Sequence, residues 1–160
     1  MTRPSFKARP IQGFTLVEMM ITIAVLGILA AIALPGFLDS IRKGRRSDAF
    51  AALSAVQQAQ ERWRGSRNAY TTSLTPQPGD DPPGLGLAAS SSRGYYSIAI
   101  NAAGANSYTA TATAVAGTLQ AGDESCQRLR VRVVAGNITY GSAGPAGDFD
   151  ESSTNQCWVR

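Results

Sequence analysis

An uninterrupted apolar stretch near the N-terminus constrains this chain more than any other feature. Residues 14–34 read FTLVEMMITIAVLGILAAIAL and carry one charged side chain, that of Glu18. A helix rises 1.5 Å per residue, so these 21 residues would reach about 30 Å, which is the thickness of the hydrocarbon core of a bilayer. The sequence therefore predicts a helix that crosses a membrane once.

The carboxylate of Glu18 is unusual in such a helix. An ionised side chain among lipid tails costs about 2.5–3.5 kcal/mol on insertion scales and is normally kept where it has a partner. No basic residue lies within the stretch. A free amine at the start of the helix would be the nearest positive group, and cleavage of the chain just before Phe14 would create it. The residues therefore point to an amine and carboxylate pair.

The residues around this carboxylate resemble the cleavage and methylation signal of type IV prepilins. Gly13, Phe14 and Glu18 stand in the order GFTLVE directly before an apolar helix. The resemblance implies that a prepilin peptidase cuts after Gly13 and methylates the new amine of Phe14, and that Glu18 then meets the N-terminal amine of a neighbouring subunit during filament assembly. Gln12 departs from the basic residue that usually precedes the glycine. The alternative is an ordinary signal anchor with a tolerated glutamate.

Residues 1–13 have the composition of a targeting leader. They contain three basic residues and no acid, and we expect them to be removed. A secretory signal peptide is the rival, but its apolar region is typically 7–15 residues and this one is longer. Three cations precede the helix and four follow it, so the positive-inside rule does not decide the orientation. Two cysteines favour an oxidising compartment for the C-terminal part. We therefore expect a single-pass protein whose C-terminal part lies outside the cytoplasm. The resemblance implies the bacterial inner membrane, with the head in the periplasm and later in an extracellular pilus.

The chain beyond the apolar stretch is long enough for one small domain. Pro35 ends the predicted transmembrane and filament-core helix (14–35) and predicts a kink, and 36–160 would form the head. Residues 37–64 predict a continued amphipathic helix, because apolar side chains recur at steps of three and four. That face comprises Ala49, Ala52, Leu53, Val56, Ala59 and Trp63. Five charged residues near its start could meet lipid phosphates or acidic groups of adjacent subunits: Arg42, Lys43, Arg45, Arg46 and Asp48.

A sheet is expected after an irregular connection. Residues 65–94 are rich in proline, glycine and serine and show little periodicity. The segments 95–100, 108–115, 129–134 and 137–140 alternate and contain many β-formers, so they predict four strands of an antiparallel meander within 95–160. In the third, Arg128, Arg130 and Arg132 would share a solvent face. The fold class is α+β, and the resemblance implies the pilin fold.

The two cysteines, Cys126 and Cys157, admit one intrachain pairing. Pilins commonly carry a C-terminal disulfide loop, and the resemblance implies this arrangement here. A bridge closing such a loop would stabilise the head by about 3–4 kcal/mol in the entropy model. The chain has no histidine, so a metal site is not expected. Acidic residues at 148, 150 and 151 leave calcium binding open, although the spacing of an EF-hand is absent.

No residue pattern supports catalysis, since there is no phosphate loop and no cofactor fingerprint. We therefore expect no enzyme activity and no cofactor. The resemblance implies a structural subunit of a type IV pilus, with a minor pilin preferred over the major one. Its partners would be other pilin subunits, the prepilin peptidase, and the inner-membrane assembly platform with its ATPase. The role in adhesion, twitching motility, DNA uptake or secretion stays open.

Two alternatives stay open, the first from the same superfamily and the second from a different functional class. One is a pseudopilin of a type II secretion system, and the other is a DNA-receptor pilin for competence, whose binding would depend on Arg128, Arg130 and Arg132. The net charge of +4 includes three leader cations, and 4 − 3 leaves +1 after processing. A nucleic-acid partner is therefore not expected from the charge alone.

Overall fold

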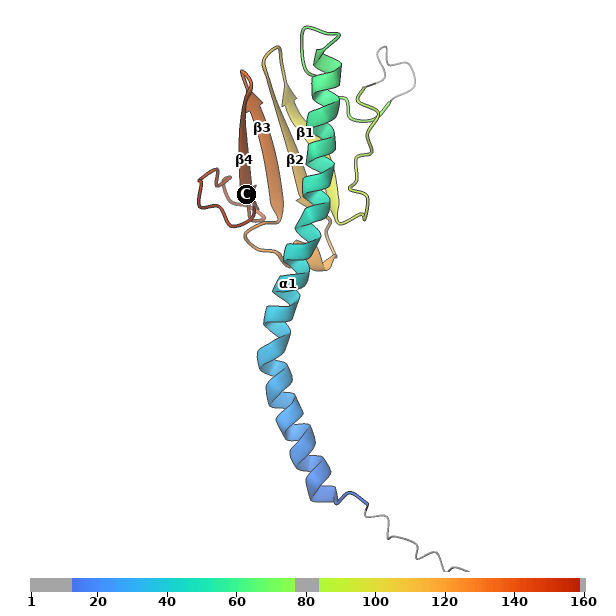
Figure 1. The fold of residues 1–160 in the computed structure, drawn as a ribbon, viewed down its shortest axis with the longest axis vertical. Helices are drawn as coiled ribbons and strands as arrows, with labels where there is room; N and C mark the ends of the chain where they lie inside the picture. Colours follow the sequence, from blue (N-terminus) through green and yellow to red (C-terminus); the bar gives the residue numbers. More distant parts are fainter. Residues whose placement is uncertain (1–12, 77–83, 159–160) are drawn as a thin grey trace, which may run out of the picture. The chain divides into compact units, whose positions relative to one another are not determined.

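The computed structural model describes residues 13–76 and 84–158 of the chain (Figure 1). One long helix, α1 (Leu16–Arg64), is followed by a four-stranded sheet and a short 3₁₀ turn, η1 (Leu119–Gly122). The strands are β1 (Tyr96–Ala103), β2 (Ser107–Ala114), β3 (Arg128–Val134) and β4 (Asn137–Ala143). The predicted α+β class, with a long N-terminal helix and an antiparallel sheet, is confirmed. The leader lies outside the described residues except for Gly13.

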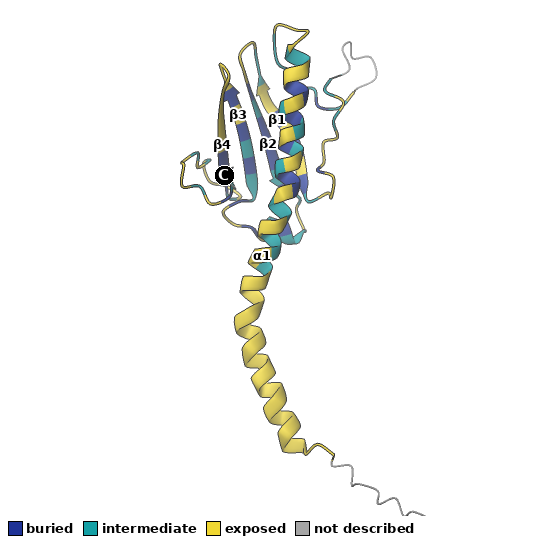
Figure 2. Cartoon of the chain, viewed as in Figure 1, coloured by how far each residue is buried: buried dark blue, intermediate teal, exposed yellow. Residues whose placement is uncertain are grey.

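The chain divides into two compact units, which meet in sequence after Leu38. In the N-terminal unit, α1 is long and apolar enough to cross a membrane by length and composition. Its large apolar side chains from Leu16 to Phe37 are exposed (Figure 2). The helix continues through Pro35, whose predicted kink stays a prediction. Such an apolar surface needs a cover from lipid or from other chains.

The sheet is a meander in which each strand pairs antiparallel with the next along the chain, in the order β1-β2-β3-β4. A two-residue turn joins β3 to β4, and both of its residues have positive φ, 49° at Ala135 and 84° at Gly136. Two-residue hairpin turns favour this conformation because it matches the twist of the strands. The predicted meander is confirmed.

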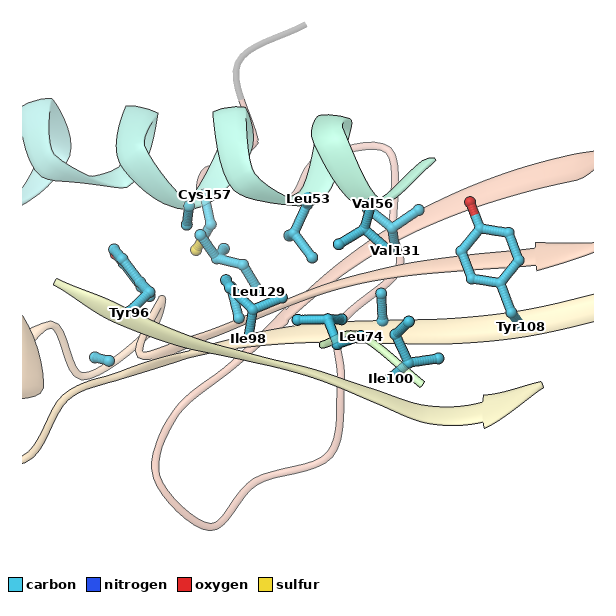
Figure 3. Packing of buried hydrophobic residues seen from close by; sticks show 14 of the residues in the cluster. Leu53, Val56, Leu74, Tyr96, Ile98, Ile100, Tyr108, Leu129, Val131 and Cys157 are labelled. Carbon is cyan, nitrogen blue, oxygen red and sulfur yellow. The ribbon is translucent and has the colours of Figure 1, made fainter. Parts of the chain in front are cut away.

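The core of the second unit lies between α1 and one face of the sheet (Figure 3). Leu53 and Val56 project from the helix onto strand residues such as Leu129 and Val131, and all four are at most 1% exposed. The predicted helix face is confirmed at Ala49, Leu53, Val56 and Ala59, which are buried. Burying each large apolar side chain stabilises the fold by about 1.5–3 kcal/mol.

The irregular connection after α1 is tied to the helix through a buried amide. The side chain of Gln60 is fully buried; it donates to the carbonyl oxygen of Thr71 at 2.6 Å and accepts from the Thr71 N–H at 3.2 Å. Leu74, three residues further on, is buried in the core. The connection between helix and sheet is therefore anchored at its beginning.

Candidate functional site

The residues of the predicted cleavage signal stand at the beginning of α1. Phe14 is 80% exposed and precedes the first helical residue by two positions. The hydroxyl of Thr15 accepts a hydrogen bond from the Glu18 N–H at 3.2 Å, which caps the helix start. Among the described residues the Glu18 carboxylate has no hydrogen-bond or ion-pair partner. It lies in the first turn, where a carboxylate is favoured by the helix dipole.

At the start of its head portion, α1 is held by an ion pair. The guanidinium of Arg46 donates to both carboxylate oxygens of Asp123, at 2.7 and 2.8 Å, and both side chains are largely buried. The side-chain amide of Gln120 also donates to Asp123, at 2.9 Å. This bidentate geometry is the strongest kind of charge-assisted contact between side chains. The pair fixes the helix to the segment around η1.

The expectation that the cations of this region face lipid or neighbouring subunits is wrong for Arg46, which is largely buried in the ion pair, and two of the other three also have contacts within the head. Arg46 pairs with Asp123. Arg42 pairs with Asp39 at 2.9 Å, and its Nε donates to the Leu119 carbonyl. Arg45 lies over the ring of Tyr95 at 4.4 Å. Only Lys43 stays exposed without such a contact among the described residues. The reason is that η1 and the β1 start present carboxylate, carbonyl and aromatic partners to this part of the helix.

Asp48, predicted to be part of the charged surface, is instead buried and receives donors from the segment before β1. Its Oδ1 accepts from the Ser92 hydroxyl at 2.9 Å and from the Arg93 N–H at 3.2 Å. Burial by itself would raise the pKa of Asp48, but hydrogen bonds from Ser91, Ser92 and the backbone at Arg93 and Tyr95 outweigh it and hold the pKa below its usual 3.8. The ionised carboxylate therefore organises this segment against the helix.

This arrangement predicts a pH-dependent stability. A carboxyl whose pKa is lower in the folded than in the unfolded chain stabilises the fold above about pH 4, and that stabilisation is lost as the pH falls through the folded pKa. We expect Asp48→Asn to destabilise the head by about 1–2 kcal/mol at neutral pH, with the difference from wild type shrinking below about pH 4. Unfolding free energies measured across this range would check it. An equal difference at neutral and acid pH would contradict the assignment.

The C-terminal residues pack and hydrogen-bond along the edge of the sheet at β4. Cys126 and Cys157 form a disulfide with a sequence separation of 31, as the resemblance implied. Between them, Asp150 pairs with Ser142 of β4 through two backbone hydrogen bonds, of 3.0 and 2.8 Å. Beyond the bridge, Trp158 donates from Nε1 to the Gly141 carbonyl at 3.0 Å. The C-terminal segment thus covers the β4 edge around residues 141–143.

The predicted solvent face of β3 is only partly open, because this segment folds over two of its arginines. Arg130 hydrogen-bonds to Glu151 and lies 3.9 Å from the centre of the Phe149 ring. Arg128 donates to the Gly144 carbonyl at 2.9 Å. Arg132 alone among the three is exposed. Arg128 and Arg130 therefore hold the C-terminal loop.

Exposed cations gather at the end of the head where α1 finishes. Arg62 and Arg67 are exposed, and Arg67 lies 3.8 Å from the centre of the Trp63 ring. Arg64 donates to Asn106 in the β1–β2 connection, and Asn106 in turn accepts from the Ala135 N–H in the β3–β4 turn. These contacts bring the helix end and both hairpin tips together. Arg132, three residues before that turn, is exposed on the face of the sheet that points away from α1, because its neighbours Val131 and Val133 are buried on the helix side.

Comparison with known proteins gives two family matches. A family model described as "Prokaryotic N-terminal methylation motif" matches residues 9–34. A second, described as "Type IV minor pilin ComP, DNA uptake sequence receptor", matches residues 35–130, more than half of the chain. The boundary between them coincides with Pro35.

Curated relatives are similar to this chain over part of their length. The fimbrial protein EcpC of Eikenella corrodens is 38% identical over 96 residues, which are 59% of this chain and 58% of that protein. The type IV major pilin protein PilA of Myxococcus xanthus is 40% identical over 60 residues, 38% of this chain and 27% of PilA. A fimbrial protein of Moraxella nonliquefaciens is 59% identical over 46 residues, 29% and 30% of the two chains. The matched segments thus cover less than two thirds of these relatives.

Proposed function

This chain belongs to the type IV minor pilin family of ComP, and on that premise we propose that it is a structural subunit of a type IV pilus. In this proposal it enters the bacterial inner membrane as a single-pass prepilin with its head in the periplasm. The prepilin peptidase cuts after Gly13 and methylates Phe14. The platform and its ATPase then move the subunit into a filament of pilins, in which it is a minor component.

One observation carries the proposal: an exposed apolar helix has one carboxylate, Glu18, in its first turn, and that carboxylate has no partner among the described residues. The hydrocarbon tails of a bilayer offer that carboxylate no charged partner, whereas the amine of a second processed chain would. The apolar surface can pass from lipid to neighbouring helices without entering water. Because this transfer gains little hydrophobic free energy, assembly needs the external motor.

The first experiment is the N-terminal mass of the protein from membranes and from sheared filaments. The proposal expects a chain that begins at methylated Phe14 in both fractions. A chain that keeps residues 1–13 and stays in membranes would identify a signal-anchored domain and end the filament proposal.

Glu18→Ala tests the carboxylate itself. We expect the variant to insert in the membrane at the wild-type level, because the change removes a charge from an apolar helix, yet to fall by about tenfold or more in sheared filaments. Quantitative immunoblots of both fractions measure this. Glu18→Gln keeps the size and removes the charge, so it should fail in the same way. Wild-type amounts of either variant in sheared filaments would contradict the proposed role of Glu18.

A second candidate function is binding of double-stranded DNA, which the name of the matched family suggests. Its support on this chain is three exposed cations toward the α1 end of the head: Arg62 and Arg67 around the helix end, and Arg132 on the sheet face that points away from the helix. Cations of this kind bind phosphates and release counterions. The sequence predicted that DNA binding would depend on all three arginines of β3. Only Arg132 is kept in this candidate site, because Arg128 and Arg130 bind the C-terminal loop.

Replacing Arg62, Arg67 and Arg132 together by alanine tests this candidate. We expect DNA binding by the full chain to weaken and the slope of log affinity against log salt to fall by about 0.9 for each phosphate that is no longer neutralised. Fluorescence anisotropy with a labelled duplex at several salt concentrations measures both. Arg93→Ala is the matched control, since Arg93 is exposed near the opposite end of the sheet. Equal weakening in the two variants would contradict a site at this end.

A further inference from the structure

The outer edge of the sheet is only half covered. In β4 the residues whose backbone N–H and C=O point away from β3 alternate along the strand. Ser142 is one of them, because its N–H and C=O both pair with Asp150. Tyr140 and Ile138 are therefore the next two, and among the described residues neither has a hydrogen-bond partner on that side. The pairing with the C-terminal segment thus ends at Ser142, and the backbone groups of Tyr140 and Ile138 could pair with a further strand.

A groove of about 540 Å³, lined by six apolar or aromatic residues and two polar ones, lies beside this free edge, between α1 and β4. Leu53 and Val131 line it, together with Ile138 and Tyr140, whose side chains are 48% and 37% exposed. Ile138 and Tyr140 stand opposite the buried Val133 and Val131 in the ladder, so they share the helix side of the sheet. The helix therefore leaves this part of the apolar face uncovered.

Three aromatic rings that contact one another are part of the groove lining. The ring of Trp158 lies 4.8 Å from the ring centres of both Phe50 and Tyr140. On the helix flank, Ser54 and Gln57 line the groove, and among the described residues neither side chain makes a hydrogen bond. No charged side chain of the described residues lines it. The site thus combines apolar surface, two uncommitted polar side chains and unpaired backbone groups.

We propose that this edge binds an extended, uncharged peptide segment of a partner protein by strand addition. The unpaired N–H and C=O groups of Ile138 and Tyr140 are complementary to a backbone, and the groove between strand and helix accepts an apolar side chain at alternate positions. Natural edge strands are normally protected by charges, proline or bulges. β4 has no charged residue and no proline. A groove without charge excludes strongly charged segments as occupants.

Hydrogen exchange on the full chain in detergent micelles tests the proposal. The probe is a capped pentapeptide that alternates threonine and isoleucine. At saturating peptide we expect exchange at the Ile138 and Tyr140 amides to slow by about tenfold, while the Ser142 amide, already paired with Asp150, changes little. The same peptide with its three central amide nitrogens methylated should give no protection. Absent protection, or equal protection by the methylated peptide, would overturn the proposal.

An Ile138→Pro variant provides a test on the protein side. Its ring removes the outward N–H without touching the bonds to β3, so the head should keep its melting temperature and lose the peptide effect. Ile138→Thr keeps the donor and should retain protection. If the proline variant does not fold, the comparison between the plain and the methylated peptide still tests the proposal.

Two other occupants of the edge can be tested. If a chain shortened after Trp158 exchanges the Ile138 amide faster than the full chain does, both without peptide, the occupant of the edge is the C-terminal end of the chain itself. Protection by a neutral disaccharide, but not by peptide, would assign the groove to sugars. Either result overturns the proposal.

Discussion

Replacing Arg46 by alanine is expected to destabilise the head by about 3–5 kcal/mol. The substitution leaves the carboxylate of Asp123 buried with no positive partner, and the loss of one member of a buried pair costs more than the pair itself contributes. Tryptophan fluorescence during denaturant unfolding of the full chain in micelles would measure the effect. It would be a large fraction of the total stability of a small domain.

The neighbouring Arg45 supplies the control. Its guanidinium lies over the Tyr95 ring, a contact worth about 0.5–1 kcal/mol at an exposed site, so Arg45→Ala should be mild. Changing both members of the pair, Arg46→Met with Asp123→Leu, should recover much of the stability, because neither charge of the pair is then left buried without its partner. If Arg46→Ala proved as mild as Arg45→Ala, the ion pair would not be what fixes the helix there.

Breaking the disulfide by Cys157→Ser is expected to cost about 3–4 kcal/mol, since the bridge closes a loop whose ends are 31 residues apart. The variant should also release the Trp158 side chain from Phe50 and Tyr140, so its fluorescence should move toward that of a solvated indole. Wild-type protein treated with reductant should reproduce both changes. An unchanged melting temperature in the variant would contradict a structural role for the bridge.

The helix and the strands could be predicted because apolar residues recur along each of them with the spacing typical of that element. The helix face was identified from apolar side chains at steps of three and four, and α1 ends at Arg64, where that pattern stops. The strands were identified by alternation and observed with longer ends, as in β4, which extends to Ala143 rather than Tyr140. Gly141 to Ala143 lack β-formers and become a strand because Asp150 and β3 pair with them.

The polar contacts of the head could not be predicted in the same way. Arg46 and Asp123 are 77 residues apart, and no local pattern links them. Asp48 was assigned to a charged surface by its type, although it stands next to Ala49 at the start of the buried helix face. That position is the signal that could have identified it as buried. In the same way, nothing local to β3 shows that Phe149 and Glu151 cover Arg128 and Arg130.

The meander also bears on how the head folds. Every strand pairs with its neighbour along the chain, so each hairpin closes a comparatively short loop and can form within microseconds. The helix reaches its partner around η1 only across 77 residues, and closing that loop has the larger entropic cost. We therefore expect the sheet to form early and the docking of α1 to limit the folding rate. Substitutions within the hairpins should then slow folding, and removal of the Arg46 side chain should slow it to the degree that the contact with Asp123 has formed when α1 docks.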